Sequence, residues 1–300
     1  MPPGALRASI ATSMTSVRVV HSETCPDIGP ICDERDEPPQ LHDQRFNIAE
    51  VRLTLAYGVW RWLGVELQAP LRINHTTVEY QRLDGEEFTP DYPAIHHRNE
   101  TLVGPGDPWL LARGERRVGA VDVTAKVGAS FPLGSTERNP FELGDMGLEH
   151  QHIQFGAGTV APVAHLSASL PIGSDWRVLG HGQAQLFVAE NDHGYRPGHR
   201  FSLGAGGSRS FGELGVSADA DVVIERPERW DGKILQDGNL GRTDVLLGAG
   251  ATYRFGRYTA GLGIKAPIYQ HIVTAGDEGG QLSYPAILDL SIEGRFDLAR

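Results

Sequence analysis

Hydrophobic and polar residues alternate with a period of two along most of the chain from residue 46 onward. Such alternation predicts β-strands that are apolar on one face and polar on the other. The clearest run is 121–132, where Val121 and Val123 oppose Asp122. Residues 244–298 repeat this format in three consecutive strands. The whole pattern predicts about eleven strands, at 46–59, 63–73, 107–117, 121–132, 163–170, 176–190, 201–210, 213–225, 244–255, 258–269 and 288–296.

The connections between these strands are alternately short and long. Short turns are predicted near 59–62, 115–119, 171–175, 211–213 and 255–258, and long polar segments lie between them, the first from His75 to Gly106. Transmembrane β-barrels have this asymmetry, with short periplasmic turns and long outer loops. We therefore predict an all-β protein that forms a closed, antiparallel, up-and-down transmembrane β-barrel. A bacterial barrel needs an even number of strands, so about twelve are expected, and 13–22 is the candidate for the additional strand.

This interpretation divides the chain into two parts. Residues 1–44 form an N-terminal segment with a candidate first strand and an acidic, proline-rich loop, and residues 45–300 form the barrel. The N-terminal segment contains Cys25 and Cys32, which could form a disulfide in an oxidising compartment or remain as two thiols. Its first twenty residues lack the apolar core of a signal peptide, so no export signal is evident in this sequence.

Composition is compatible with a membrane barrel and excludes other classes. Hydrophobic residues make up 40% of the chain, and no stretch approaches the ~20 apolar residues of a membrane helix. A barrel can have this polarity because half of each strand faces a wet lumen. The net charge of −11 argues against a nucleic-acid partner, which usually binds a basic face. A soluble, lipocalin-like barrel with its apolar face inward is the rival fold.

Aromatic residues gather at strand ends beside the short turns. This position is expected of a girdle at the level of the lipid headgroups. The residues are Tyr57, Trp60, Trp62, Trp176, Phe211, Phe255, Tyr258 and Phe296.

Charged residues on the polar strand faces are the candidates for the lining of the lumen. They could line a conduit that selects solutes, or they could form a salt-bridged plug that fills the barrel. Both alternatives remain open. The candidates are Glu66, Arg72, Asp122, Lys126, Arg177, His181, Asp219, Asp221, Arg254, Lys265, Asp289, Glu293 and Arg295.

Two further sequence features could carry catalysis or metal binding. His165 and Ser167 share a strand face, as in membrane-embedded esterases, but they fall on the lumenal face and no orienting third residue is identifiable. The pairs His96–His97 and His150–His152 have spacings that can bind metal, although solvated loop histidines are the simpler interpretation. We therefore expect no catalytic residues, no bound metal and no cofactor, and we do not expect an enzyme.

A series of short motifs resembles a known family over about residues 46–298. The motifs are LAYGVW at 55–60, LQAP at 67–70, GPGDPWL at 104–110, FPLG at 131–134, FGAGTVAP at 155–162, YRFG at 253–256 and IKAPIYQ at 264–270. They resemble bacterial outer-membrane barrels regarded as transporters or as proteins of the phenol-degradation meta pathway. The resemblance implies an outer-membrane location and passage of small, including aromatic or hydrophobic, compounds.

The expected function is therefore a channel or transporter for small solutes in the outer membrane of a Gram-negative bacterium. Its partners would be outer-membrane lipid and lipopolysaccharide, the barrel-assembly machinery and small-molecule solutes. The alternative is a non-conducting structural or adhesive barrel that acts through its outer loops, and a more remote one is a membrane-embedded hydrolase.

Overall fold

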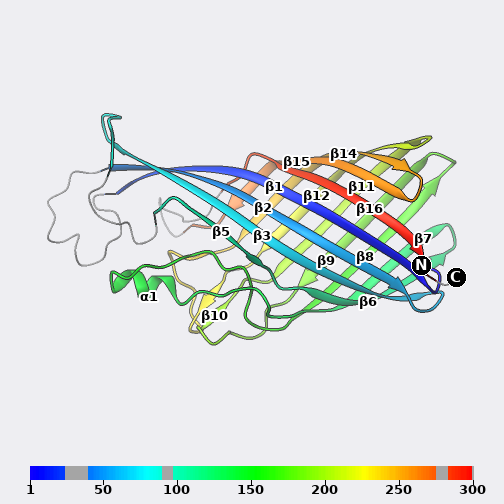
Figure 1. Cartoon of the computed structure of the whole chain (residues 1–300), viewed down its shortest axis with the longest axis horizontal. Coiled ribbons are helices and arrows are strands. Elements are labelled where there is room, and N and C mark those ends of the chain that lie inside the picture. Colours follow the sequence, from blue (N-terminus) through cyan, green and yellow to red (C-terminus); the bar gives the residue numbers. More distant parts are fainter. Residues whose placement is uncertain (24–39, 90–96, 275–282, 299–300) are drawn as a thin grey trace.

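The computed structural model describes residues 1–23, 40–89, 97–274 and 283–298, and these form one elongated β-barrel (Figure 1). Twelve long strands of this described part make up its wall. They are β1 (Ala5–Glu23), β2 (Gln40–Gly58), β3 (Leu63–Arg82), β6 (Trp109–Val118), β7 (Val121–Ser130), β8 (Ala161–Ile172), β9 (Trp176–Gln185), β11 (Arg200–Phe211), β12 (Leu214–Glu225), β14 (Arg242–Phe255), β15 (Tyr258–Ile272) and β16 (Ile287–Asp297).

Every wall strand is antiparallel to its two neighbours in the ring, and the neighbours are successive in the chain. The ring closes where β1 pairs with β16, in a register that runs from Ala5 opposite Asp297 to Met14 opposite Leu288. Among the described residues, each of the twelve strands therefore has a hydrogen-bonded partner on both sides over at least part of its length. This closure satisfies the backbone polar groups that a bilayer could not. The predicted up-and-down barrel of about twelve strands is confirmed.

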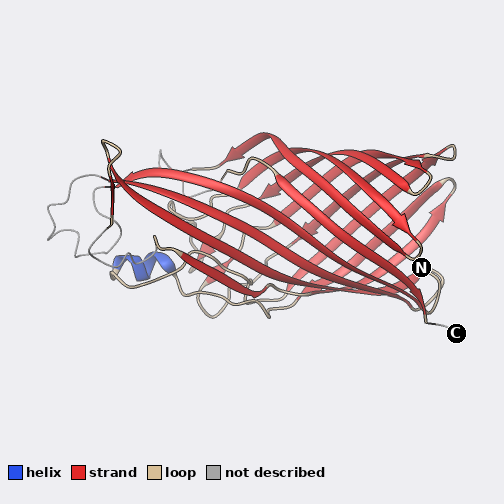
Figure 2. Cartoon of the chain, turned by 45° about the horizontal axis from the view of Figure 1, so that its top comes forward, coloured by secondary structure: helices blue, strands red, loops and turns tan. Residues whose placement is uncertain are grey.

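The remaining elements lie towards the end of the barrel that carries the long connections (Figures 1 and 2). A short helix, α1 (Pro140–Asp145), lies in the connection between β7 and β8. Strands β4 (Glu87–Phe88) and β5 (Glu100–Pro105) pair with β3, and β10 (Tyr195–Arg196) pairs with β13 (Arg229–Trp230). Among the described residues, no helix has the length and apolar composition needed to cross a membrane.

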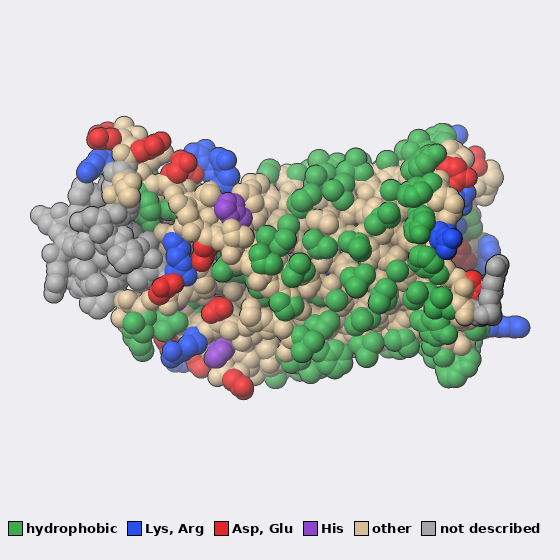
Figure 3. All heavy atoms as spheres, in the orientation of Figure 1, with side chains coloured by type: hydrophobic (Ala, Val, Ile, Leu, Met, Phe, Trp, Pro, Cys, Tyr) green, Lys and Arg blue, Asp and Glu red, His purple; other side chains and the backbone are tan. Residues whose placement is uncertain are grey.

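The apolar face of each strand points outward, as the membrane interpretation requires and contrary to the lipocalin-like alternative. Leu203, Val127 and Leu262 are 67%, 59% and 55% exposed, whereas Glu66 on the opposite face is 1% exposed. Apolar side chains cover the visible outer surface of the barrel, and charged side chains are concentrated at its two ends (Figure 3). A surface with this distribution is stable in a bilayer and not in water.

Short turns and both described chain ends lie at one end of the barrel (Figures 1 and 2). Four of these turns contain a glycine in the left-handed region, with φ between 61° and 65°, a conformation that other residues adopt only with strain. These glycines are Gly119, Gly173, Gly212 and Gly256. Aromatic side chains in or beside the short turns, such as Trp60, Trp62 and Trp176, are more than half exposed.

Several strand boundaries differ from the sequence prediction. β1 begins at Ala5 rather than at residue 13, and β2 begins at Gln40 rather than at residue 46. β3 continues to Arg82 and pairs with β2 along its whole length, although His75–Arg82 was expected to be loop. Beyond the bilayer the outward face need not be apolar, so the polar composition of this stretch does not prevent a strand. β9 ends at Gln185 rather than at Glu190. The residues around Cys25 and Cys32 lie outside the described part of the chain.

Candidate functional site

The most informative irregularity in the wall is a break between β5 and β6. Both strands run antiparallel to β3, β5 opposite Leu71–Thr76 and β6 opposite Leu63–Gln68, so together they form one interrupted strand. The interruption is Gly106–Asp107–Pro108, and the Asp107 side chain is only 8% exposed. Proline removes a backbone donor and favours such a break. The break allows Asp107 to bind groups that are not part of the wall.

Asp107 holds the connection between β7 and β8, residues 131–160, against the interior. One carboxylate oxygen accepts a hydrogen bond from Gly134 N at 2.9 Å, and the other accepts one from Ala157 N at 2.7 Å. These two amides belong to opposite arms of the connection, so a single carboxylate joins both arms to the wall. We call residues 131–160 the inward loop.

The last part of the inward loop, around Phe155, lies inside the end of the barrel that carries the long connections. Phe155 is 7% exposed and Ala157 is 3% exposed, and Arg72 Nη1 donates a hydrogen bond to Phe155 O at 2.8 Å. A side chain at Gly104 would meet the Phe155 ring, so β5 accommodates the ring only because residue 104 is glycine. The loop therefore narrows the lumen at this level.

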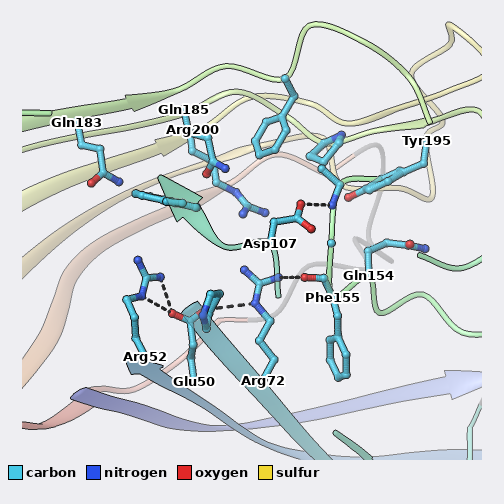
Figure 4. Close-up of a pocket in the computed structure, with 16 residues that line it drawn as sticks. Glu50, Arg52, Arg72, Asp107, Gln154, Phe155, Gln183, Gln185, Tyr195 and Arg200 are labelled. Carbon is cyan, nitrogen blue, oxygen red and sulfur yellow. Dashed lines mark hydrogen bonds and ion pairs between the residues drawn. The ribbon is translucent and has the colours of Figure 1, made fainter. Parts of the chain in front are cut away.

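A cavity of about 290 Å³ lies beside Phe155 of the inward loop (Figure 4). Its walls come from β2, β3, β6, β9, β11 and the loops above them. The lining residues are Glu50, Arg52, Pro70, Arg72, Asp107, Trp109, Gln154, Phe155, Gly156, Ala157, Gln183, Gln185, Phe187, Tyr195, Pro197 and Arg200. The lining thus combines charged groups, amides and aromatic rings.

Three guanidinium groups and two carboxylates contribute the charge of this cavity. Glu50 accepts hydrogen bonds from Arg52 Nε at 3.0 Å and from Arg72 Nε at 3.2 Å (Figure 4). Both oxygens of Asp107 face backbone amides. Arg200 pairs with Glu225 at 3.0 Å, which is not part of the lining. The lining itself holds three guanidinium groups and two carboxylates, and Glu225, outside the lining, supplies a third carboxylate to Arg200.

Aromatic rings lie beside two of the three arginines of the lining. The Arg52 guanidinium lies 5.2 Å from the centre of the Trp109 ring, and that of Arg200 lies 5.6 Å from the Phe187 ring. Such cation–π contacts hold the guanidinium plane without neutralising its charge. Burial raises the pKa of Tyr195, so its phenol stays protonated as a neutral hydrogen-bonding group.

A second group of charges lies closer to the short-turn end, around Glu66. The Glu66 side chain accepts hydrogen bonds from Lys126 Nζ at 2.7 Å, Arg113 Nη1 at 2.8 Å and Gln68 Nε2 at 2.7 Å. The structure thus brings together the predicted lumenal residues Glu66 and Lys126. Arg113 was missed by the sequence analysis.

On the opposite part of the ring, two ion pairs reach across an intervening strand. His181 Nε2 on β9 lies 3.2 Å from Asp221 Oδ1 on β12, with Gly204 of β11 between them. Lys265 Nζ on β15 lies 3.1 Å from Asp219 Oδ2 on β12, with Gly248 of β14 between them. Lys265 also pairs with Asp221.

Replacing Gly204 with alanine is expected to separate His181 from Asp221 and to lower the stability by about 1–2 kcal/mol. The new Cβ would lie 2.5 Å from His181 Cε1 and would also meet Asp221. Gly182→Ala is the matched control, because its Cβ would have its nearest neighbours at 3.7 Å. Denaturant unfolding in lipid vesicles measures both variants. Equal stability of the two would contradict the bridging role of Gly204.

Other predicted lumenal residues form pairs nearer the short-turn end or along β16, apart from these groups. Arg177 lies 3.4 Å from Asp122, and Arg254 lies 2.6 Å from Glu213. Arg295 lies 2.9 Å from Glu293, and Asp289 accepts a hydrogen bond from Ser13. Of the predicted lumenal residues, only Arg72 lines the cavity beside the inward loop, which we call the outer cavity. That these residues contact a passing solute stays a prediction.

The remaining candidates for chemistry are not joined into a site. His165 stacks on His181 with ring centres 6.4 Å apart, and no hydrogen bond between His165 and Ser167 is found in the described residues. The rings of His150 and His152 lie 5.1 Å apart. Within the described part of the chain, no group of three or more histidine, cysteine or acidic residues could hold a metal ion. His96 lies outside that part.

Comparison with known proteins shows which fold the chain has. No protein-family model matches the chain, and no curated protein matches it in sequence. Its structure is similar to the COG4313 outer membrane channel from Pseudomonas putida F1, with a TM-score of 0.65 and 13% identity over 99% of this chain and 97% of that chain. The Pseudomonas putida toluene transporter TodX gives a TM-score of 0.43 and 9% identity over 98% and 90% of the two chains. A TM-score this low adds nothing to the fold assignment. The chain therefore has the fold of an outer-membrane β-barrel channel.

Proposed function

We propose that this protein is an outer-membrane channel that passes small polar solutes through its lumen and favours negatively charged ones. The observation that carries the proposal is the cavity beside the inward loop, where Arg52, Arg72 and Arg200 face two carboxylates, one of which is directed to backbone amides. Guanidinium groups bind carboxylates and phosphates in bidentate geometry. A negatively charged solute would find hydrogen-bond donors there.

The size of the cavity supports passage of small solutes only. A volume of about 290 Å³ corresponds to roughly ten water molecules at the ~30 Å³ that each occupies in the liquid. An aromatic anion would additionally contact Trp109 and Tyr195, which line the cavity.

The location follows from the outer surface. The outward apolar face, the exposed aromatic residues beside the short turns and the fold shared with an outer membrane channel all support insertion in the outer membrane. The short turns would then face the periplasm. Phospholipid, lipopolysaccharide and the barrel-assembly machinery would be the partners of the protein in this setting.

Conductance in planar bilayers tests the proposal. Wild-type protein should give stepwise currents with a reversal potential that indicates anion preference under a salt gradient. Arg52→Gln/Arg200→Gln should shift that potential towards cations. A unit charge at 4 Å in water contributes about 1 kcal/mol, which is roughly fivefold in local anion concentration, so the permeability ratio should fall several-fold at low salt.

The matched control is Arg254→Gln, an arginine paired with Glu213 near the short-turn end of the barrel, which should leave the selectivity close to that of the wild type. Protein that inserts but passes no current would overturn the channel proposal. It would favour the alternative of a non-conducting barrel that acts through its outer loops. Current without a difference between the variants would overturn the anion preference alone.

A further inference from the structure

Arg209 is a charged residue on the outward face of the barrel, which is mostly apolar. It lies on β11 two residues before the strand ends at Phe211. Leu203 and Phe211 have the same parity and are 67% and 50% exposed, whereas Gly204, of the opposite parity, faces His181 and Asp221 in the interior. Because side chains alternate along a strand, Arg209 points outward, towards the membrane.

The guanidinium group of Arg209 is held by two aromatic rings. It lies 5.2 Å from the centre of the Trp176 ring and 4.6 Å from that of the Phe211 ring. Trp176 is directly opposite Arg209 in the pairing of β9 with β11, and the two rings are 53% and 50% exposed. The rings fix the position of the charge but provide no anion.

In the described part of the chain, no acidic residue pairs with this charge. Among the described residues, Arg209 forms no ion pair, and its Nε atom is buried without a hydrogen-bond partner. Glu213, which follows in the adjacent turn, is paired with Arg254 at 2.6 Å. The Nε atom itself is shielded, but the Arg209 side chain is only partly buried, so an anion from outside the chain would bind the terminal nitrogens of the guanidinium group.

The depth of Arg209 indicates where that acceptor is. A cation on the lipid-facing side of a barrel costs about 2–4 kcal/mol at the bilayer midplane but only about 0–1 kcal/mol near the interface. Arg209 lies in the ring of exposed aromatic residues beside the short turns, which is the level of the headgroups. The anion available at that level is the phosphate of a phospholipid, and arginine binds phosphate with its planar fork of donors.

A second arginine at the same end is surrounded in the same way. Arg257 lies in the turn between β14 and β15, with its guanidinium 6.0 Å from the Tyr258 ring centre and 5.7 Å from that of Phe296. Its side chain is exposed. The recurrence on a separate pair of rings indicates that an arginine between aromatic rings is a feature of this rim rather than of one strand.

We propose that Arg209, with Trp176 and Phe211, forms a binding site for the phosphate headgroup of a phospholipid in the periplasmic leaflet, and that Arg257 forms a second, more exposed one. The proposal rests on the membrane orientation given above and is independent of whether the lumen conducts. Bound lipid would fix the depth and tilt of the barrel at its short-turn end.

Native mass spectrometry of the detergent-purified protein tests this site without measuring current. Wild-type protein should retain phosphatidylglycerol at least about tenfold better than a glucosyl diacylglycerol with the same acyl chains, since only the former offers a charge-assisted hydrogen bond. This comparison requires no variant. Equal retention of the two lipids would overturn the proposal, because apolar contact alone would then explain binding.

Substitutions of Arg209 test whether this residue binds the lipid. Arg209→Gln should lower phosphatidylglycerol retention about tenfold, and Arg209→Lys should lower it less because the charge remains without the fork. Arg254→Gln, at the same end but ion-paired, should match the wild type. Unchanged retention in Arg209→Gln would overturn the assignment. Displacement of the lipid by millimolar inorganic phosphate would also overturn it, since it would indicate a site for free anions rather than for a membrane lipid.

Discussion

Replacing Asp107 with alanine is expected to release the inward loop and to raise single-channel conductance. The substitution removes both acceptors that join Gly134 and Ala157 to the wall. Each buried amide left without a partner costs about 1–3 kcal/mol. At 1.4 kcal/mol for each factor of ten, the population of released conformations should rise by about tenfold or more, and we expect the lumen to be wider in those conformations.

Bilayer recordings check this expectation, and hydrogen exchange of residues 131–160 provides a readout that does not depend on conduction. Asp107→Asn should have an intermediate effect because its amide keeps a single acceptor oxygen. Asp145→Ala is the matched control: it removes an exposed carboxylate from the same loop, at the end of α1. If Asp107→Ala matched the wild type in both conductance and exchange, Asp107 would not be what holds the loop.

The barrel itself could be predicted because lipid and lumen impose opposite chemistry on adjacent residues. Each of the eleven strands expected from residue 46 onward exists, and the structure places a further strand at Ala5–Glu23. One place where the pattern failed is the point where this constraint ends. Residues 75–82 continue β3 outside the apolar belt, where both faces can be polar, so their composition gave no strand signal.

β6 shows a second limit of the pattern. Its apolar residues fall on both parities, which prevented assignment of its faces. In the structure Leu110 is 47% exposed and faces the membrane, whereas Leu111 is 1% exposed. An apolar side chain on the inner face is stable there because it is shielded from water. The unassigned faces also hid Arg113, which belongs to the same inner face as Leu111.

The outer cavity could not be predicted from alternation because it depends on contacts distant in the sequence. Asp107 lies in the break between two strands and so has no strand face. Glu50 and Arg52 were on the polar face of a predicted strand, but nothing in their spacing places them near Phe155, about a hundred residues later. Arg200 begins β11 one residue before the predicted strand. What brings these residues together is the inward loop, whose path follows from hydrogen bonds to single residues.

Replacing Glu66 with alanine is expected to cause the largest loss of stability of any single substitution considered above. The Glu66 side chain is 2% exposed and pairs with Lys126 and Arg113, which are 17% and 11% exposed. Removing one partner of a buried ion pair costs about 3–5 kcal/mol because the remaining charge is uncompensated, and here two cations would remain next to each other.

Denaturant unfolding in lipid vesicles, followed by tryptophan fluorescence, measures the loss. Glu66→Ala/Lys126→Ala should recover part of it, because Arg113 also pairs with Glu115 and the cation–cation repulsion is relieved. Asp122→Ala is the matched control, since Asp122 is 46% exposed and its pair with Arg177 should contribute no more than about 1 kcal/mol. A Glu66→Ala variant as stable as Asp122→Ala would mean that water reaches this group. The lumen would then be open at the level where its charges are most tightly paired.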